Sequence, residues 1–150
     1  MTFNGVRVGE IGLNALIAGY YKVPVIMISG DKVACREASD LIPGIETAVV
    51  KESIGAYAGI CYHPVKCREM IYKAVQNAVA RHDSISPLVL EGQVRMTLRM
   101  TTASGIDRAL RLPGAERISG DTLKYEAENY YRAFQAFLAI ADLRELVPFI

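Results

Sequence analysis

The sequence predicts an α/β fold: a mixed, largely parallel sheet flanked by helices in the first half, followed by an antiparallel strand and hairpin region and a C-terminal helix. Two observations lead to this prediction. In residues 5–50, short β-branched runs alternate with helical stretches, the order typical of crossover units on a parallel sheet. In residues 93–127, strand patterns recur with a turn signal between two of them, which favours antiparallel pairing.

The first half is expected to alternate strands with helices. The first helix is so rich in Leu, Ile and Ala that it should be buried or nearly so. The apolar run VPVIMIS, which follows it, predicts a central strand covered on both faces. Asp31 can cap the second helix, which should stop at the turn-forming sequence IPG. The expected order is strand 5–8, helix 11–21, strand 23–29, helix 32–41 and strand 45–50.

The second half contains the clearest amphipathic helix of the chain, over residues 64–82. Its apolar residues recur at the spacing of one helical face: Cys67, Met70, Ile71, Ala74, Val75, Ala78 and Val79. Residues 93–100 alternate apolar and polar side chains, which predicts a strand with one wet face. A helix-like stretch near residues 106–112 precedes two strand arms around a two-residue turn, Gly120-Asp121. The last helix should begin near Glu128 and bury Tyr130, Phe134, Phe137, Leu138 and Ala141.

Length and composition indicate a single folded domain over residues 1–150. A chain of this length should bury about 70% of the surface that its unfolded form exposes. The composition, 51% hydrophobic and 22% charged, is ordinary for a globular protein. Three cysteines without a CxxC pair predict reduced thiols rather than a disulfide framework.

Charge and hydropathy exclude two classes of partner. The net charge is +1, and no run of Lys and Arg would follow a phosphate backbone, so nucleic acid is not expected as a partner. No apolar stretch approaches the roughly 20 residues of a membrane span. The first residues lack the pattern of a secretory signal. We therefore expect a cytoplasmic location and no membrane partner.

The segment CYHPVKC offers Cys61, His63 and Cys67 as soft metal ligands. Zinc ligands usually come in pairs two to four residues apart, with a second pair elsewhere, and no second pair occurs here. Cys67 lies on the apolar helix face, and His63 precedes the proline that starts the helix, so both have structural interpretations. His82, Ser104 and Ser119 lack the partners of a nucleophilic site, and no phosphate-binding glycine motif occurs.

Glu10 lies between two glycines where the first strand gives way to the first helix, in VGEIGLNALIAGYYKVPV. An acid in the first turn of a helix is stabilised by the helix dipole, and this alone would account for its position. Because almost only apolar residues follow, the sequence also predicts a buried carboxylate, which is costly unless it is paired or binds a cation. The pattern leaves both interpretations open.

Six segments occur in order from about Asn4 to the end of the chain: NGVRVGEIGLNALIAGYYKVPVIMISGD, DLIPGIETAVVKESIG, HPVKCREMI, PLVLEGQVRMTLRM, LPGAERISGDTLKYEA and YRAFQAFLAI. Together they closely resemble the C-terminal half of the zinc-dependent D-aminopeptidases encoded with dipeptide-transport operons, and VGEIGLNA is the most specific segment. The resemblance implies that Glu10 ligates one of two zinc ions. It also implies hydrolysis of N-terminal D-amino acids from short peptides by a metal-activated water, in rings that are typically decamers.

The resemblance has a gap. Family members carry a D-x-E-G motif, two histidine ligands, one of them in a G-Y-H-A-like segment, and a catalytic histidine, all upstream of the Glu. None of these has a counterpart here, and His63 of CYHP lies downstream, so that role is not assigned to it. We expect the N-terminal metal-binding half to be absent and zinc ligation to be at most partial. The chain alone, with no catalytic residue, should be inert.

Two further expectations follow. Asn14, one helical turn beyond Glu10, should lie on the same side, where it could bind substrate, steady the ligand or contact the backbone at the helix end. A missing half would expose apolar surface and favour association with a complementary N-terminal half or with further copies of the chain. The alternative function is therefore a non-catalytic assembly or interaction module that retains the family fold.

Overall fold

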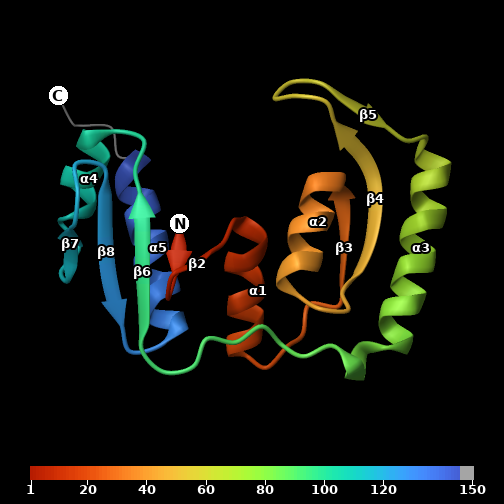
Figure 1. Cartoon of the computed structure of the whole chain (residues 1–150), viewed down its shortest axis with the longest axis horizontal. Coiled ribbons are helices and arrows are strands. Elements are labelled where there is room, and N and C mark those ends of the chain that lie inside the picture. The colour runs from red at the N-terminus through yellow and green to blue at the C-terminus, as the bar shows by residue number, and fades with distance from the viewer. Residues whose placement is uncertain (146–150) are drawn as a thin grey trace. The chain divides into compact units, whose positions relative to one another are not determined.

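The structure, a computed structural model, describes the backbone of residues 1–145 and the side chains of residues 1–102 and 104–141 (Figure 1). The chain divides into two compact units. Unit 1 combines Met1–Leu13 with the chain from Leu90 onward, and unit 2 is Asn14–Val89. Each unit has its own group of buried apolar side chains. No helix in the described part is both long enough and apolar enough to cross a membrane.

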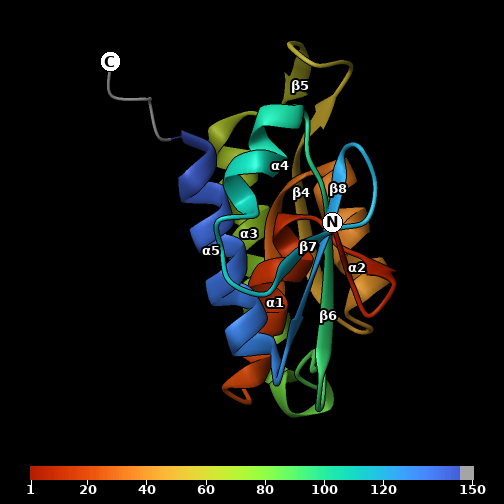
Figure 2. The same ribbon diagram turned by 90° about the vertical axis from the view of Figure 1, so that its left-hand side faces the viewer.

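Unit 1 is built on a five-stranded sheet in the order β2-β1-β6-β8-β7, and every neighbouring pair is antiparallel. Its helices α4 and α5 lie on one face of this sheet (Figure 2). The elements are β1 (Thr2–Phe3), β2 (Val6–Arg7), β6 (Val94–Arg99), α4 (Ala103–Ala109), β7 (Ala115–Arg117), β8 (Thr122–Ala127) and α5 (Tyr130–Glu145).

The alternating strand predicted over residues 93–100 is confirmed as β6. Its inward side chains, Val94, Met96 and Leu98, are at most 6% exposed, whereas the arginines between and after them face solvent. The turn between β7 and β8 was predicted wrongly: residues 118–121 form a four-residue connection, in which Ile118 and Ser119 both donate backbone hydrogen bonds to the Thr122 carbonyl.

Helix α5 begins two residues later than predicted and buries a shifted set of side chains. Tyr130 is buried as expected, but among the side chains described in α5 the other buried ones are Ala133, Ala136 and Ile140. Leu138 is 45% exposed, and the aromatic rings at 134 and 137 are half-buried. Two of the buried positions are alanines, whose small side chains allow a helix to pack close to its neighbour.

Unit 2 holds a three-stranded sheet in the order β3-β4-β5. Strands β3 and β4 are parallel and are joined through α2, whereas β5 returns antiparallel to β4. Figure 1 shows α2 and α3 on opposite faces of this sheet. The elements are β3 (Met27–Asp31), α2 (Lys32–Leu41), β4 (Glu46–Ser53), β5 (Gly59–Cys61), α3 (Pro64–Ala80) and a 3-10 turn, η1 (His82–Ser84). Helix α1 (Glu10–Tyr20) starts in unit 1 and continues into unit 2.

The mixed α/β class is confirmed, but the largely parallel sheet is not. Only β3 and β4 pair in parallel, and the strand near residues 5–8 belongs to the antiparallel sheet of unit 1 as β2. The apolar run 23–29 becomes a strand only from Met27, at an edge of the three described strands, and Val23 is 54% exposed. An apolar run shows that a segment can be buried but does not determine which strands will flank it.

Local signals in unit 2 were more reliable. Asp31 caps α2 as predicted, accepting the Val33 amide at 2.8 Å. Helix α3 is confirmed over nearly the predicted range, and His63 caps it by accepting the Val65 amide at 3.3 Å. Strand β5 was not predicted. Of the expected apolar face of α3, Ala74 and Ala78 are buried, whereas the valines at 75 and 79 are 43% and 58% exposed.

Candidate metal ligand and polar cluster

Glu10 is the first residue of α1. The preceding residue, Gly9, accepts the Leu13 amide at 3.1 Å, which closes the first turn. The Glu10 side chain is exposed, so the expectation of a buried carboxylate was wrong. The apolar residues of α1 lie on other sides of the helix: Gly12, Leu13, Ala15, Leu16 and Gly19 are buried, while Glu10 projects from the first turn.

The Glu10 carboxylate has no hydrogen bond or ion pair with any residue that the structure describes. It lies at the positive end of the helix dipole, which favours a negative charge there. Asn14, four residues further along α1, is also exposed. A solvated, uncommitted carboxylate is available to a ligand that approaches from outside the described residues.

A second group of polar side chains, which the sequence analysis missed, lies where β3 and β4 end. Asp31 accepts the Val33 amide through Oδ1, and it accepts the amide and hydroxyl of Ser53 through Oδ2 at 2.8 and 2.6 Å. Hydrogen bonding from the Ser53 hydroxyl and the Val33 amide lowers the pKa of Asp31. Both of its oxygens are therefore engaged in fastening α2 to β4.

Glu52 is committed in the same way. Its Oε1 accepts the Tyr62 hydroxyl at 2.7 Å, and its Oε2 accepts the Lys32 ammonium at 3.1 Å. The Tyr62 hydrogen bond and the Lys32 charge lower the pKa of Glu52, and the same bond raises the pKa of Tyr62. The proximity of Asp31 and Ser53 could be predicted from the sequence only if the parallel pairing of β3 with β4 were already known.

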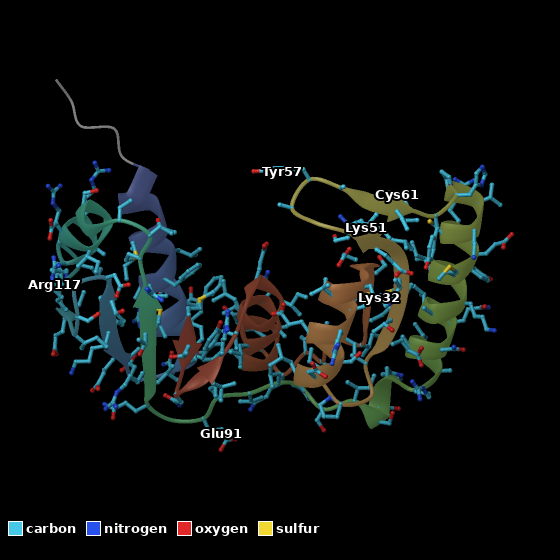
Figure 3. All side chains as sticks on the ribbon, turned by 45° about the horizontal axis from the view of Figure 1, so that its top comes forward. Lys32, Lys51, Tyr57, Cys61, Glu91 and Arg117 are labelled. Atoms are coloured by element: carbon cyan, nitrogen blue, oxygen red, sulfur yellow. The ribbon has the colours of Figure 1, made fainter. Side chains whose placement is uncertain are left out.

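The three potential ligands of CYHPVKC each have a different environment. His63 caps α3 through Nδ1, and the Cys67 thiol faces backbone carbonyls, with its Sγ at 3.4 Å from the Tyr62 oxygen. Cys61 lies exposed on β5 (Figure 3). His82, the first residue of η1, contacts the Val79 carbonyl and the Asp83 carboxylate, each at 2.9 Å.

Comparison with known proteins decides the family. The sequence profile of the family Peptidase_M55, described as D-aminopeptidase, matches residues 1–139. The chain belongs to this D-aminopeptidase family. The match includes Glu10, Asn14 and the whole of unit 2.

A sequence match and a structural match, each to a D-aminopeptidase of Bacillus subtilis, cover most of the chain. A D-aminopeptidase of Bacillus subtilis (strain 168) is 35% identical over 137 residues, which are 91% of this chain and 50% of that protein. The solved structure of the Zn-dependent D-aminopeptidase DppA from Bacillus subtilis, described as a self-compartmentalizing protease, superposes with a TM-score of 0.94 at 33% identity. The superposition covers 99% of this chain and 55% of the DppA chain. The chain therefore spans about half the length of these D-aminopeptidases.

Zinc is the metal of the solved D-aminopeptidase, and the metal-ligating side chains of the described residues fit a zinc site only in part. A glutamate oxygen is a normal zinc ligand, and the Glu10 carboxylate has no hydrogen bond or ion pair with the part of the chain that the structure describes. Within the residues that the structure describes, however, no three His, Cys, Asp or Glu side chains come together as a metal-binding group. Glu10 could supply one ligand, and the remaining ligands would have to come from elsewhere.

Proposed function

We propose that this chain contributes the C-terminal portion of a zinc metallopeptidase that removes N-terminal D-amino acids from short peptides. The observation that carries the proposal is the exposed, uncommitted carboxylate of Glu10 at the start of α1, in a chain that belongs to the D-aminopeptidase family. The zinc dependence of the solved relative supports the choice of metal.

Within this proposal, Glu10 binds zinc through a carboxylate oxygen at the start of α1. Asn14 follows at the spacing of one helical turn, and its amide would hydrogen-bond the peptide substrate or the ligating carboxylate. When bound, zinc supplies an acidified water for attack on the peptide carbonyl. We assign no catalytic residue to this chain, because no three His, Cys, Asp or Glu side chains come together among its described residues.

The other ligands would come from a complementary polypeptide that corresponds to the part of the relatives this chain does not match. The complete enzyme is proposed to bind two zinc ions. This chain alone then provides only part of their ligands and is inactive. Since the solved relative is described as self-compartmentalizing, we also propose that this chain assembles with copies of itself, as subunits of a ring such as a decamer.

Reconstitution tests the proposal. The purified chain is assayed on a D-alanyl peptide with zinc, alone and after co-expression with the unmatched half of the Bacillus subtilis relative. We expect activity only in the combination, and we expect the variant Glu10→Gln to abolish it without loss of folding. Full activity in the Glu10→Gln combination would refute the ligand assignment, and two zinc ions bound by this chain alone would refute the partial site.

The absence of a three-ligand group among the described residues favours one alternative function. A non-catalytic assembly or interaction module would keep the family fold without using Glu10. Isothermal titration of the reconstituted complex with zinc separates the two functions, because only the enzyme should lose zinc affinity when Glu10 becomes Gln.

A further inference from the structure

The connection between β4 and β5 is the most exposed apolar segment of unit 2. We call residues 53–61 the arm; it consists of the end of β4, the loop 54–58 and β5. All nine residues of the arm are exposed, including three large apolar side chains: Ile54 at 71%, Tyr57 at 103% and Ile60 at 55%. Figure 3 shows Tyr57 at the tip, directed away from the strands.

The arm is ordered by its own backbone rather than by packing. The amides of Ile54 and Gly55 both donate to the Ala58 carbonyl, at 2.9 and 3.3 Å, and this closes the loop. Ser53 and Gly59 pair at the base of the loop, and the Ser53 hydroxyl is fixed on Asp31. Apolar side chains that this hairpin holds in water add no hydrophobic stabilisation to unit 2. Such a surface is suited to binding another surface.

The composition of the arm points to the kind of partner. Its sequence, SIGAYAGIC, contains no charged residue and no proline. Strand β5 is an edge of the described three-stranded sheet, and edge strands that must stay single are usually protected by Lys, Pro or bulges. An uncharged surface meets its own copy without like-charge repulsion, so it suits self-association better than binding to a charged partner.

We propose that the arm is a protomer–protomer contact through which copies of this chain assemble. The inference rests on the homo-oligomer in the proposed function, and it adds which segment makes the contact. Ile54 and Tyr57 of one copy become buried against a second copy, and the β5 edge provides backbone groups for pairing at the same place.

Sedimentation velocity of the chain over a range of concentrations tests the contact. The double variant Ile54→Ser with Tyr57→Ser should sediment as a smaller species than the parent, or should need at least about tenfold more protein to assemble. The matched control is Tyr72→Ser with Val79→Ser on α3, where the two side chains are 67% and 58% exposed outside the arm. The control should assemble like the parent. Equal assembly of the arm variant and the parent would overturn the proposal, as would a monomeric parent.

A fluorescent variant tests burial at the tip directly. The chain contains no Trp, so Tyr57→Trp introduces its one indole, with Tyr72→Trp as the control. Emission from position 57 should shift to shorter wavelength as assembly proceeds, and emission from position 72 should not. No shift at 57, or equal shifts at both positions, would overturn the proposal. Either negative result leaves the reconstitution assay on Glu10 unaffected, so failure of the arm and failure of the proposed enzyme can be told apart.

Discussion

At the scale of single residues, Glu10 differs from Asp31 and Glu52 in what surrounds its carboxylate. Asp31 and Glu52 each use both oxygens within the fold, whereas Glu10 uses neither among the described residues. We therefore expect Glu10→Gln to change the free energy of unfolding by less than about 0.5 kcal/mol, as for other surface substitutions. In the reconstituted enzyme it should lower zinc affinity by more than about 100-fold, the upper range for outer-shell partners.

Urea unfolding and zinc titration measure the two effects separately. A large loss of stability would show that Glu10 is needed for folding rather than for metal binding. Asp40→Asn in α2, also exposed, is the control for a lost surface charge.

Asp121 should make the free energy of unfolding depend on pH in the acid range. The Arg99 guanidinium, at 2.5 Å, and the hydroxyls of Thr122 and Ser119 lower the pKa of Asp121 to about 2. Because the pKa is depressed in the folded state, the stabilisation is complete above the unfolded pKa, near 3.9, and is lost as the pH falls toward 2.

We therefore expect Asp121→Asn to be less stable than the parent at pH 6 and to approach the parent as the pH falls from about 4 to about 2. Urea midpoints over this range measure the convergence. Glu91→Gln, an exposed residue before β6, should show no such convergence. A constant difference across the range would contradict the role of the Asp121 charge.

The site could be predicted from the sequence only in part. VGEIGLNA singled out Glu10, but the apolar residues after it wrongly predicted burial, because residues on one helix need not share an environment. Asp31 was recognised as a cap from its place before a helix. Its bonds to Ser53 depend on parallel strand pairing across 22 positions, which no local pattern encodes.

At the scale of elements, Tyr130 joins α5 to the start of the chain. It is 1% exposed, its ring packs edge-on against Phe3 at 5.2 Å, and its hydroxyl donates to the Leu13 carbonyl at 2.7 Å. Tyr130→Phe should cost about 1 kcal/mol of folding free energy through the lost hydrogen bond. Tyr130→Ala should cost about 3–5 kcal/mol through the cavity. Calorimetry or urea unfolding would show this order, and equal losses would contradict it.

Gly19 marks a close approach between α1 and the loop that follows η1, within unit 2. A Cβ at this position would lie 1.8 Å from the Leu88 carbonyl oxygen, so the backbone of residue 88 occupies the place of a side chain. We expect Gly19→Ala to destabilise the protein by about 1–3 kcal/mol through overpacking. Gly30→Ala, where no atom lies within 4 Å of the added Cβ, is the control. A Gly19→Ala midpoint equal to that of the control would refute the contact.

Element types were easier to predict than their partners. The alternation in β6, the cap signal of α2 and the proline at the start of α3 are local, and the structure confirms each of them. The parallel sheet was overestimated because β2 was read as the first strand of a crossover unit. Its actual partner is β1, and β1 pairs with β6, which lies far along the chain. Such non-local pairing depends on packing that a single sequence does not display.

At the scale of the whole molecule, the number of zinc ions bound per chain tests whether this chain alone holds a complete metal site. No three His, Cys, Asp or Glu side chains come together among the described residues, so the chain alone should retain less than one zinc ion after dialysis, measured by elemental analysis. Addition of the complementary half should raise the bound zinc. Two zinc ions on the dialysed chain alone would contradict the partial site.

Unit 1 is discontinuous in sequence, whereas unit 2 is continuous. Thr2 of β1 pairs with Thr97 of β6, and the 76 residues of unit 2, Asn14–Val89, come between them. During synthesis on the ribosome, the second unit to begin is therefore the first that can be completed. Residues 1–13 must wait several seconds for their partners, at translation rates of about 5–20 residues per second. Until β6 emerges, β1 lacks the strand with which it pairs in unit 1, and unpaired strand edges favour aggregation.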